Sequence, residues 1–340
     1  MHGDHGWVNL VLGILLWVVT ISPALAIVDG EVDPNAMDSA WAGVGSISVG
    51  GGTYSGALIA TNYVLTAAHV VSGRAPEDIT FNLNFGGDLT HRIAVEAVFV
   101  RPGYRGAEGF RHGGEYDIAV LKLAEPVPAG VPIYGLYDEE LPQGAVLTFV
   151  GYGGGGIGTV GVTESPNPSV KRSGGNVAEC FAFTMGEENC GIEAFMGIGP
   201  KAIYVYRFDS PLAHRGNGRG RLLIGEAGLA GGDSGSPAFV YVQDGWRIAA
   251  VNTFAGRESA KGRMSVYGTV GGGVLIAGEN AQWLRGIIAP PESGAHPPPQ
   301  NQPHVPEPRT WFLLAIGAVN VVVALWRHRS RAATAPSTPF

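Results

Sequence analysis

The sequence predicts an all-β protein, and three observations support this fold class. Short apolar runs rich in Val, Ile, Leu and Tyr alternate with turn residues, a pattern typical of a β-sandwich or barrel. The chain of 340 residues contains 53 glycines and 23 prolines; because an interior glycine costs a helix about 1 kcal/mol, a helical bundle is excluded. Charged residues make up 15 % and hydrophobic residues 45 % of the chain, which excludes intrinsic disorder.

The expected elements follow from these apolar runs. The predicted strands lie at residues 57–60, 63–66, 118–123, 145–150, 202–206, 238–242 and 248–251. A single helix is expected at residues 279–288, because Ala281, Leu284, Ile287 and Ile288 recur at helical spacing.

Charge and cysteine content narrow the class of protein further. The formal net charge is −7, whereas nucleic-acid binders usually carry a basic patch, so no nucleic-acid partner is expected. Two cysteines cannot build a disulfide-dense scaffold or a four-cysteine zinc site. Neither cysteine has histidines at ligand spacing, so we expect no metal site and no cofactor.

The N-terminus has the features of a secretory signal peptide over residues 1–26. An apolar segment at residues 7–22 is followed by Pro23 and by Ala24, Leu25 and Ala26, a small-x-small cleavage site. Residues 1–6 contain no Lys or Arg, so the alternative is an uncleaved N-terminal anchor. We expect signal peptidase to cut after Ala26.

The C-terminus carries a second apolar run between Trp311 and Trp326, followed by a basic cluster at residues 327–331. A run of this length is short for a membrane span, which needs about 20 residues, but flanking Trp and Arg residues suit a membrane boundary. A Pro-Glu-Pro motif at residues 306–308 precedes the run, and residues 291–308 form a Pro-rich linker.

This order of parts resembles the PEP-CTERM sorting signal of Gram-negative bacteria, with residues 309–340 as the transmembrane and sorting segment. The resemblance implies export through the inner membrane, transient membrane association and processing by an exosortase. The protein would then lie at the cell surface or outside the cell. An ordinary C-terminal anchor is the alternative.

Three short segments carry candidate chemistry. His69 ends the motif Thr-Ala-Ala-His after an apolar run, where it is expected at a strand end. Asp117 opens a run of residues that are expected to be buried, which is unfavourable for a carboxylate without a partner. Ser234 lies in Gly-Asp-Ser-Gly, a turn whose N–H groups can converge on an anion. Each has a structural explanation when taken alone, but a hydroxyl nucleophile needs a base, and the base needs an orienting acid.

Together the three segments, over most of residues 27–290, resemble the trypsin-like serine peptidases of the chymotrypsin fold. The resemblance implies two packed six-stranded antiparallel β-barrels, a C-terminal helix and a site between the barrels. It implies Ser234 as nucleophile, His69 as base and Asp117 as the orienting acid. The N–H groups of Gly232 and Ser234 would form the oxyanion hole.

The same resemblance suggests a role for the new N-terminus. Cleavage after Ala26 would expose Ile27, and in this family the ammonium of a new terminal Ile inserts beside the Asp that precedes the catalytic Ser. That residue is Asp233 here. We expect the Ile27–Asp233 pair to form directly after signal cleavage; the alternative is that Ile27 starts an ordinary strand.

Cysteines and pocket residues depart from the family pattern. Tyr54 and Val70 occupy the positions of the family's disulfide beside the catalytic His. Cys180 and Cys190 remain, and an exported chain favours a disulfide between them, with two buried thiols as the alternative.

The position of the trypsin specificity acid is Gly228, so cleavage after Arg or Lys is not expected. The other predicted pocket residues are Thr253, Phe254 and Ser265, and Phe254 is expected to narrow the pocket toward small or medium apolar side chains.

A glycine-rich segment at residues 151–156 matches the dinucleotide-binding pattern G-x-G-x-x-G. Such a site needs a helix directly afterwards, whereas the following residues read as a loop. The sequence therefore predicts an exported serine endopeptidase acting on protein or peptide substrates. The alternatives are a surface or extracellular-matrix binding protein on a peptidase scaffold, and an esterase, which is disfavoured because the G-x-S-x-G elbow is absent.

Overall fold

A computed structural model of the chain describes residues 27–106, 116–182, 202–211, 225–243, 245–257 and 262–289. One unit of the chain spans Met1–Pro291. Four predicted features lie outside the described residues and stay predictions: the signal peptide (1–26), the linker (291–308), the sorting tail (309–340) and the disulfide of Cys190. Within the described ranges, no helix is long and apolar enough to cross a membrane.

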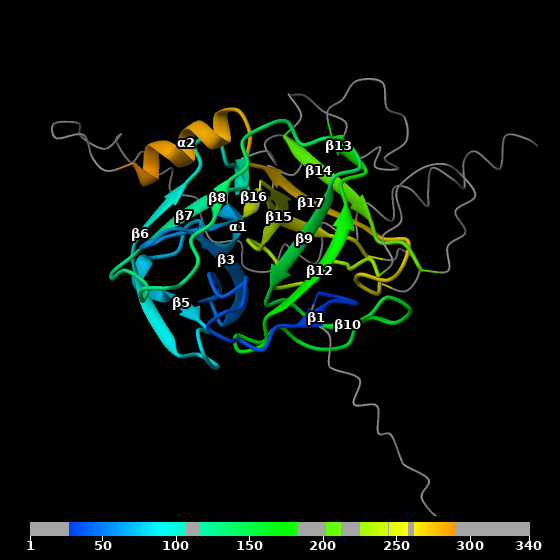
Figure 1. Ribbon diagram of the computed structural model, residues 1–340, viewed down its shortest axis with the longest axis horizontal. Helices are drawn as coiled ribbons and strands as arrows, with labels where there is room; N and C mark the ends of the chain where they lie inside the picture. The colour runs from blue at the N-terminus through cyan, green and yellow to red at the C-terminus, as the bar shows by residue number, and fades with distance from the viewer. Residues whose placement is uncertain are drawn as a thin grey trace, which may run out of the picture. The chain divides into compact units, whose positions relative to one another are not determined.

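Six strands close into a barrel in the first half of the chain, drawn blue to cyan in Figure 1. Its order is β2-β3-β4-β7-β6-β5, and every neighbouring pair is antiparallel. The strands are β2 (Val44–Val49), β3 (Gly52–Ala60), β4 (Tyr63–Thr66), β5 (Ile79–Leu83), β6 (His91–Val100) and β7 (Ala119–Leu123). This confirms the all-β class.

The second half differs from the expected second six-stranded barrel. Its described strands form a nine-stranded sheet in the order β1-β12-β9-β15-β16-β17-β14-β13, with β8 paired to β16. They are β1 (Glu31–Val32), β8 (Gly135–Leu136), β9 (Val146–Gly151), β12 (Arg172–Val177), β13 (Cys180–Ala182), β14 (Ile203–Arg207), β15 (Pro237–Val242), β16 (Gly245–Ala255) and β17 (Val270–Leu275). Connecting segments contribute two of these strands: β1 extends the edge at β12, and β8 pairs in parallel with β16.

Helices are few, and only one of them was anticipated. Helix α2 (Glu279–Ile288) has the predicted bounds and buries Ala281 and Leu284 in the hydrophobic cluster that includes the core of the first barrel. Two short elements were missed: the one-turn helix α1 (Ala68–Val71) and the 3-10 turn η1 (Pro76–Asp78). The glycine-rich segment expected as a loop enters a small hairpin of β10 (Gly156–Ile157) and β11 (Gly161–Val162), and no helix follows it.

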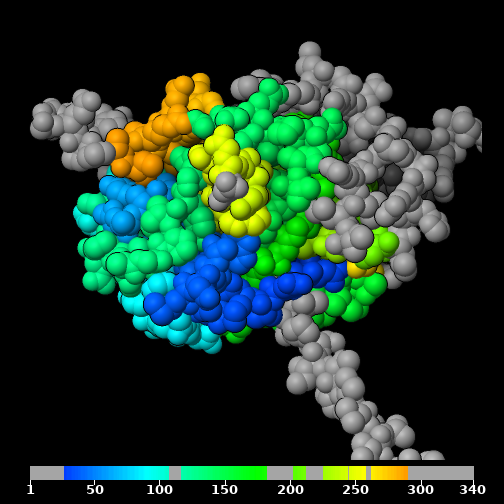
Figure 2. Space-filling model, in the orientation of Figure 1, coloured from blue at the N-terminus to red at the C-terminus, as the bar shows by residue number. Residues whose placement is uncertain are grey.

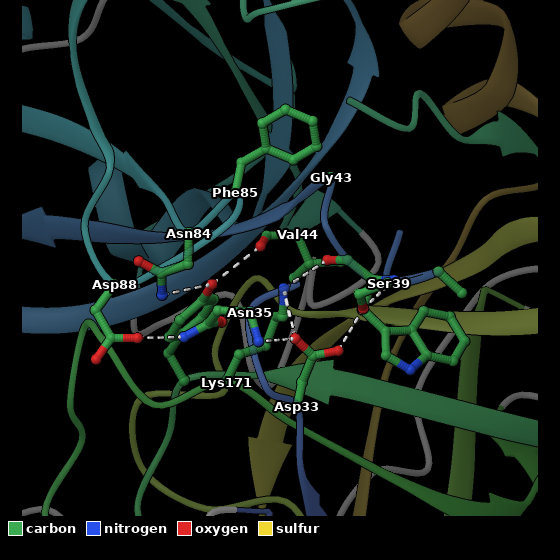
Figure 3. Close-up of polar contacts among 12 residues, drawn as sticks. Asp33, Asn35, Ser39, Gly43, Val44, Asn84, Phe85, Asp88 and Lys171 are labelled. Atoms are coloured by element: carbon green, nitrogen blue, oxygen red, sulfur yellow. Dashed lines mark hydrogen bonds and ion pairs between the residues drawn. The ribbon is translucent and has the colours of Figure 1, made fainter. Parts of the chain in front are cut away.

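The first residues of the described chain join the nine-stranded sheet to the barrel. In Figure 2 this segment, dark blue, runs across one face of the molecule between the green sheet and the cyan part of the barrel. Figure 3 shows the polar contacts that hold it. The Lys171 ammonium is fully buried, 3.2 Å from the Asp33 carboxylate, and donates to the carbonyl of Trp41. The Asn35 side-chain amide donates to Asp88 and to the carbonyl of Ser169.

Candidate active site

His69 and Asp117 meet because β4 and β7 are antiparallel neighbours. Thr66, at the end of β4, pairs with Ala119, at the start of β7, so the residues just beyond these ends lie side by side. The sequence suggested that His69 lies at a strand end, whereas it lies in the one-turn helix α1, just after β4. Its Nδ1 lies 2.7 Å from Asp117 Oδ2, and its backbone N–H donates to Asp117 Oδ1 at 2.8 Å.

This arrangement fixes the orientation of the imidazole. The Asp117 carboxylate is buried, with a side chain 4 % exposed, whereas the His69 side chain is 27 % exposed. When Nδ1 carries the proton that it donates to Asp117, the Nε2 lone pair is free to accept another. Among the described residues, Nε2 of His69 has no hydrogen-bond partner.

Ser234 lies in a tight turn between Ala230 and β15, where Gly232 and Gly235 have φ of +95° and +84°. The carbonyl of Gly231 accepts the N–H of Gly154 at 2.8 Å. Because a peptide unit is planar and trans, the N–H of Gly232 points the opposite way. Within the described ranges, neither this N–H nor that of Ser234 has a partner. Two free N–H groups close together on one turn can bind a developing oxyanion.

The Ser234 turn packs directly on the barrel segment that leads to His69. A Cβ added at Gly235 would lie 2.1 Å from the Thr66 hydroxyl oxygen and 3.0 Å from the backbone nitrogen of Ala67. Only glycine allows this approach. No hydrogen bond joins the Ser234 hydroxyl to His69 among the described contacts; bonds of this kind often shorten only when substrate is bound.

Asp233 is buried behind the turn, with 1 % exposure. Its carboxylate accepts the N–H of Gly153 at 2.8 Å and that of Ala230 at 2.9 Å. Burial raises the pKa of Asp233 to about 7, although these two bonds and the charge of Arg172 act in the opposite direction. A buried carboxyl of this kind would be stabilised in its charged form by a nearby cation.

Ile27 is fully buried in the same apolar cluster as Leu229 and Ala230. The neighbouring Val28 forms an isolated bridge with Gly228, so the chain start lies beside the segment that leads to the Ser234 turn. Ile27 precedes β1 and belongs to no strand. The described contacts record no bond between Ile27 and Asp233.

The predicted pocket residues fall into two groups: Gly228 and Ser265 lie beside Leu229, and Thr253 and Phe254 lie on β16. A Cβ at Gly228 would lie 2.7 Å from the Phe208 ring, so no acidic side chain fits there without rearrangement. The Ser265 hydroxyl donates to the carbonyl of Leu229, which is the residue after Gly228. Phe254 lies across from Gly272 on β17 and packs, as Val270 does, on a buried cluster of Cys180, Ile203 and Val205. Thr253 is buried beside it.

Ser55, a buried residue of β3, was not identified from the sequence, where no motif marks it. Its hydroxyl donates to the carbonyl of Gly232, and its N–H donates to that of Ser234. Cys180 is buried in β13; because Cys190 lies outside the described residues, the disulfide stays a prediction.

Comparison with known proteins gives a family match over part of the chain. Residues 30–180 match the family model of trypsin. This range includes His69 and Asp117 and stops before Ser234. No curated protein matches the chain.

Two solved structures are similar. One is the inactivated protease paralogue S-D1 of the scabies mite, 16 % identical, with 77 % of this chain and 97 % of that chain covered and a TM-score of 0.53. The other is a Glu endopeptidase in complex with MPD, 14 % identical, with 77 % and 96 % covered and a TM-score of 0.48. The chain thus combines a trypsin-type segment at residues 30–180 with an all-β fold that a protease paralogue shares.

Proposed function

We propose that the protein is an exported serine endopeptidase that cleaves protein or peptide substrates through an acyl-enzyme on Ser234. The observation that carries the proposal is the pair of N–H groups on Gly232 and Ser234, which have no partner among the residues that the structure describes. They belong to a turn that packs against the residues leading to the His69–Asp117 pair. A merely structural turn has no need for such a pair.

In the proposed reaction the Ser234 hydroxyl oxygen attacks the substrate carbonyl carbon, and its proton passes to Nε2 of His69. Asp117 accepts the Nδ1–H bond and stabilises the imidazolium. The carbonyl oxygen becomes an oxyanion bound by the N–H groups of Gly232 and Ser234. Collapse breaks the C–N bond while His69 returns the proton to the leaving amine. Water then hydrolyses the ester by the same proton transfers and restores Ser234.

Removal of the leader after Ala26 is part of the proposal. Ile27 has φ of +46° in the continuous chain, a conformation that is an outlier for a β-branched residue and costs about 1–3 kcal/mol. In a chain that starts at Ile27 this torsion no longer exists, so the strain disappears. The new ammonium would then be available to the buried Asp233 carboxyl. Signal peptidase, an exosortase and transient membrane association remain proposals on the sequence alone.

A fluorophosphonate probe, which modifies activated serines, tests the function. We expect labelling of the wild-type protein and none of Ser234→Ala, and a peptide-library digest should yield cleaved peptide bonds. The digest also separates a peptidase from an esterase. If labelling does not depend on Ser234, the proposal fails.

That outcome would favour the second candidate, a binding protein on a peptidase scaffold. The observation in its favour is that the similar scabies mite structure is described as an inactivated protease paralogue.

A further inference from the structure

One buried serine of the first barrel bonds the Ser234 turn at two carbonyls, through its side chain and through its backbone. Ser55, on β3, is fully buried. Its Oγ accepts the N–H of Tyr152 at 3.0 Å and donates to the carbonyl of Gly232 at 3.0 Å. Its backbone N–H donates to the carbonyl of Ser234 at 3.1 Å. Since a hydroxyl has a single proton to donate, that of Ser55 is committed to Gly232.

The bond to Gly232 matters because glycine does not hold its own conformation. Gly232 has φ of +95°, a region that glycine enters and leaves at little cost. The peptide before it is held by the bond from Gly154 to the carbonyl of Gly231. The peptide after it is held at its carbonyl by the Ser55 hydroxyl and at its N–H by the carbonyl of Ala230. Ser55 provides the one side-chain bond that the described residues give to a carbonyl of residues 231–234.

We infer that Ser55 is a positioning residue that keeps the oxyanion-binding N–H groups of Gly232 and Ser234 aimed at one point. The inference rests on the proposed function. Without the hydroxyl, the Gly232 carbonyl and the Tyr152 N–H would both be buried without partners. The turn would rotate to satisfy them, and the two N–H groups would lose their common direction. The affinity for the transition state would fall, whereas the affinity for the substrate before the reaction would change little.

The structure supplies a matched control on the neighbouring strand. Ser46 is the cross-strand partner of Ser55 and is equally buried. Its hydroxyl donates to the carbonyl of Pro168 at 3.3 Å and accepts a bond from Asn82, and it makes no described contact with the Ser234 turn. Loss of this hydroxyl tests what a buried serine contributes to stability alone.

The experiment compares the wild-type protein that starts at Ile27 with its Ser55→Ala and Ser46→Ala variants, using p-nitrophenyl acetate as a substrate that needs no specificity pocket. We expect Ser55→Ala to lower kcat about tenfold or more with KM within twofold, whereas Ser46→Ala keeps both within twofold. The affinity for phenylboronic acid, whose serine adduct places an oxygen in the oxyanion hole, should fall by a similar factor in Ser55→Ala only. If Ser55→Ala does not fold, Ser55→Cys and Ser46→Cys replace the pair, since a thiol fills the space but donates weakly.

An unchanged kcat in an active Ser55 variant overturns the inference and leaves the proposed function intact. Equal losses of kcat in the Ser55 and Ser46 variants overturn it as well, because they would reflect lost stability. A wild-type protein without Ser234-dependent hydrolysis overturns the proposed function and the inference together.

Discussion

Val28 and Gly228 exchange backbone hydrogen bonds in both directions, at 2.8 and 3.0 Å. This pairing fixes where the chain enters the core, one residue after Ile27. Because consecutive Cα atoms lie about 3.8 Å apart, a single added residue would move a terminal ammonium well beyond hydrogen-bond reach of its former position. In the proposed mature chain, this pairing would set the position of the terminus together with the cleavage site.

From this we predict that one alanine placed before Ile27 in the mature chain lowers the rate of fluorophosphonate labelling of Ser234 at least tenfold. The physical reason is that the ammonium can no longer pair with the buried Asp233 carboxyl, which lies next to the nucleophile. Ile27→Val, with the terminus unchanged, is the control and should label almost normally. Equal labelling of the extended and mature chains would show that the new terminus has no role.

The titration of Asp233 gives a second prediction. In the unprocessed chain, where Ile27 carries no ammonium, burial raises the pKa of Asp233 to about 7, above the ordinary value of 3.8. Between these values the folded carboxyl keeps a proton that the unfolded chain has lost, so the free energy of unfolding falls as pH rises from 4 to 7 and then levels off. Asp233→Asn removes this titration and should flatten the slope. Urea unfolding at several pH values measures it, and an identical slope in both chains would contradict the prediction.

Gly232→Ala should remove most of the activity. The new Cβ would lie 2.8 Å from Pro166 Cγ and 2.9 Å from the Cα of Gly153, at a φ of +95° that alanine rarely adopts. The turn must shift, and loss of one oxyanion donor lowers kcat by about 10²–10³-fold. Gly231→Ala is the matched control, because a Cβ there meets only the Met264 sulfur at 3.9 Å. We expect its kcat to fall severalfold at most; a loss equal to that of Gly232→Ala would count against a specific role.

Phe254→Gly should broaden cleavage toward larger side chains if its ring narrows the substrate pocket. A Cβ at Gly272 would lie 2.7 Å from the Phe254 ring, so this ring covers the backbone of β17. Removing the ring uncovers that backbone and opens space beside it. A peptide-library digest compares the variant with wild type, and Phe254→Leu, which keeps an apolar cover, serves as control. An unchanged cleavage profile would rule out this role.

The sequence predicted elements that depend on local pattern. Apolar runs located seven strands, β3, β4, β7, β9, β14, β15 and β16, and missed others such as β2, β5, β6, β12 and β17. Helical spacing located Glu279–Ile288 with its observed bounds. Prediction from the sequence failed where contacts between two distant segments decide the local structure. His69 sits in a helical turn because Asp117, 48 residues away, binds both its ring and its backbone N–H. Ser55 is 177 residues from Gly232, and a lone serine in a strand gives no sign of such a partner.

Charged residues show the same limit. Lys171 and Arg172 are adjacent charged residues in the sequence, yet they are 0 % and 3 % exposed. Each has a carboxylate partner from another segment: Asp33 lies 3.2 Å from Lys171, and Glu164 lies 2.8 Å from Arg172. Burial of a charge is decided by whether a partner is present in the fold, and one sequence does not show that pairing.

The buried Lys171–Asp33 pair gives the last prediction, which concerns stability. Burial lowers the pKa of Lys171, while the Asp33 carboxylate acts in the opposite direction. Lys171→Met leaves Asp33 as an unpaired buried charge and should reduce the free energy of unfolding by about 3–5 kcal/mol. Lys122 offers a control. Its Nζ lies 2.7 Å from the Glu96 carboxylate, but this ion pair is at the surface. Lys122→Met should leave the free energy of unfolding almost unchanged, because solvent screens an exposed ion pair.

Urea unfolding of the two variants in a Ser234→Ala background, which prevents self-cleavage, measures both losses. Adding Asp33→Asn to Lys171→Met should recover part of the stability, because the uncompensated charge is gone while the Asn35 N–H can still bond the new amide oxygen. Equal losses for Lys171→Met and Lys122→Met would mean that the joint between the sheet and the barrel does not depend on this pair. A large loss confined to Lys171→Met would identify the pair as the contact that ties the chain start to the sheet.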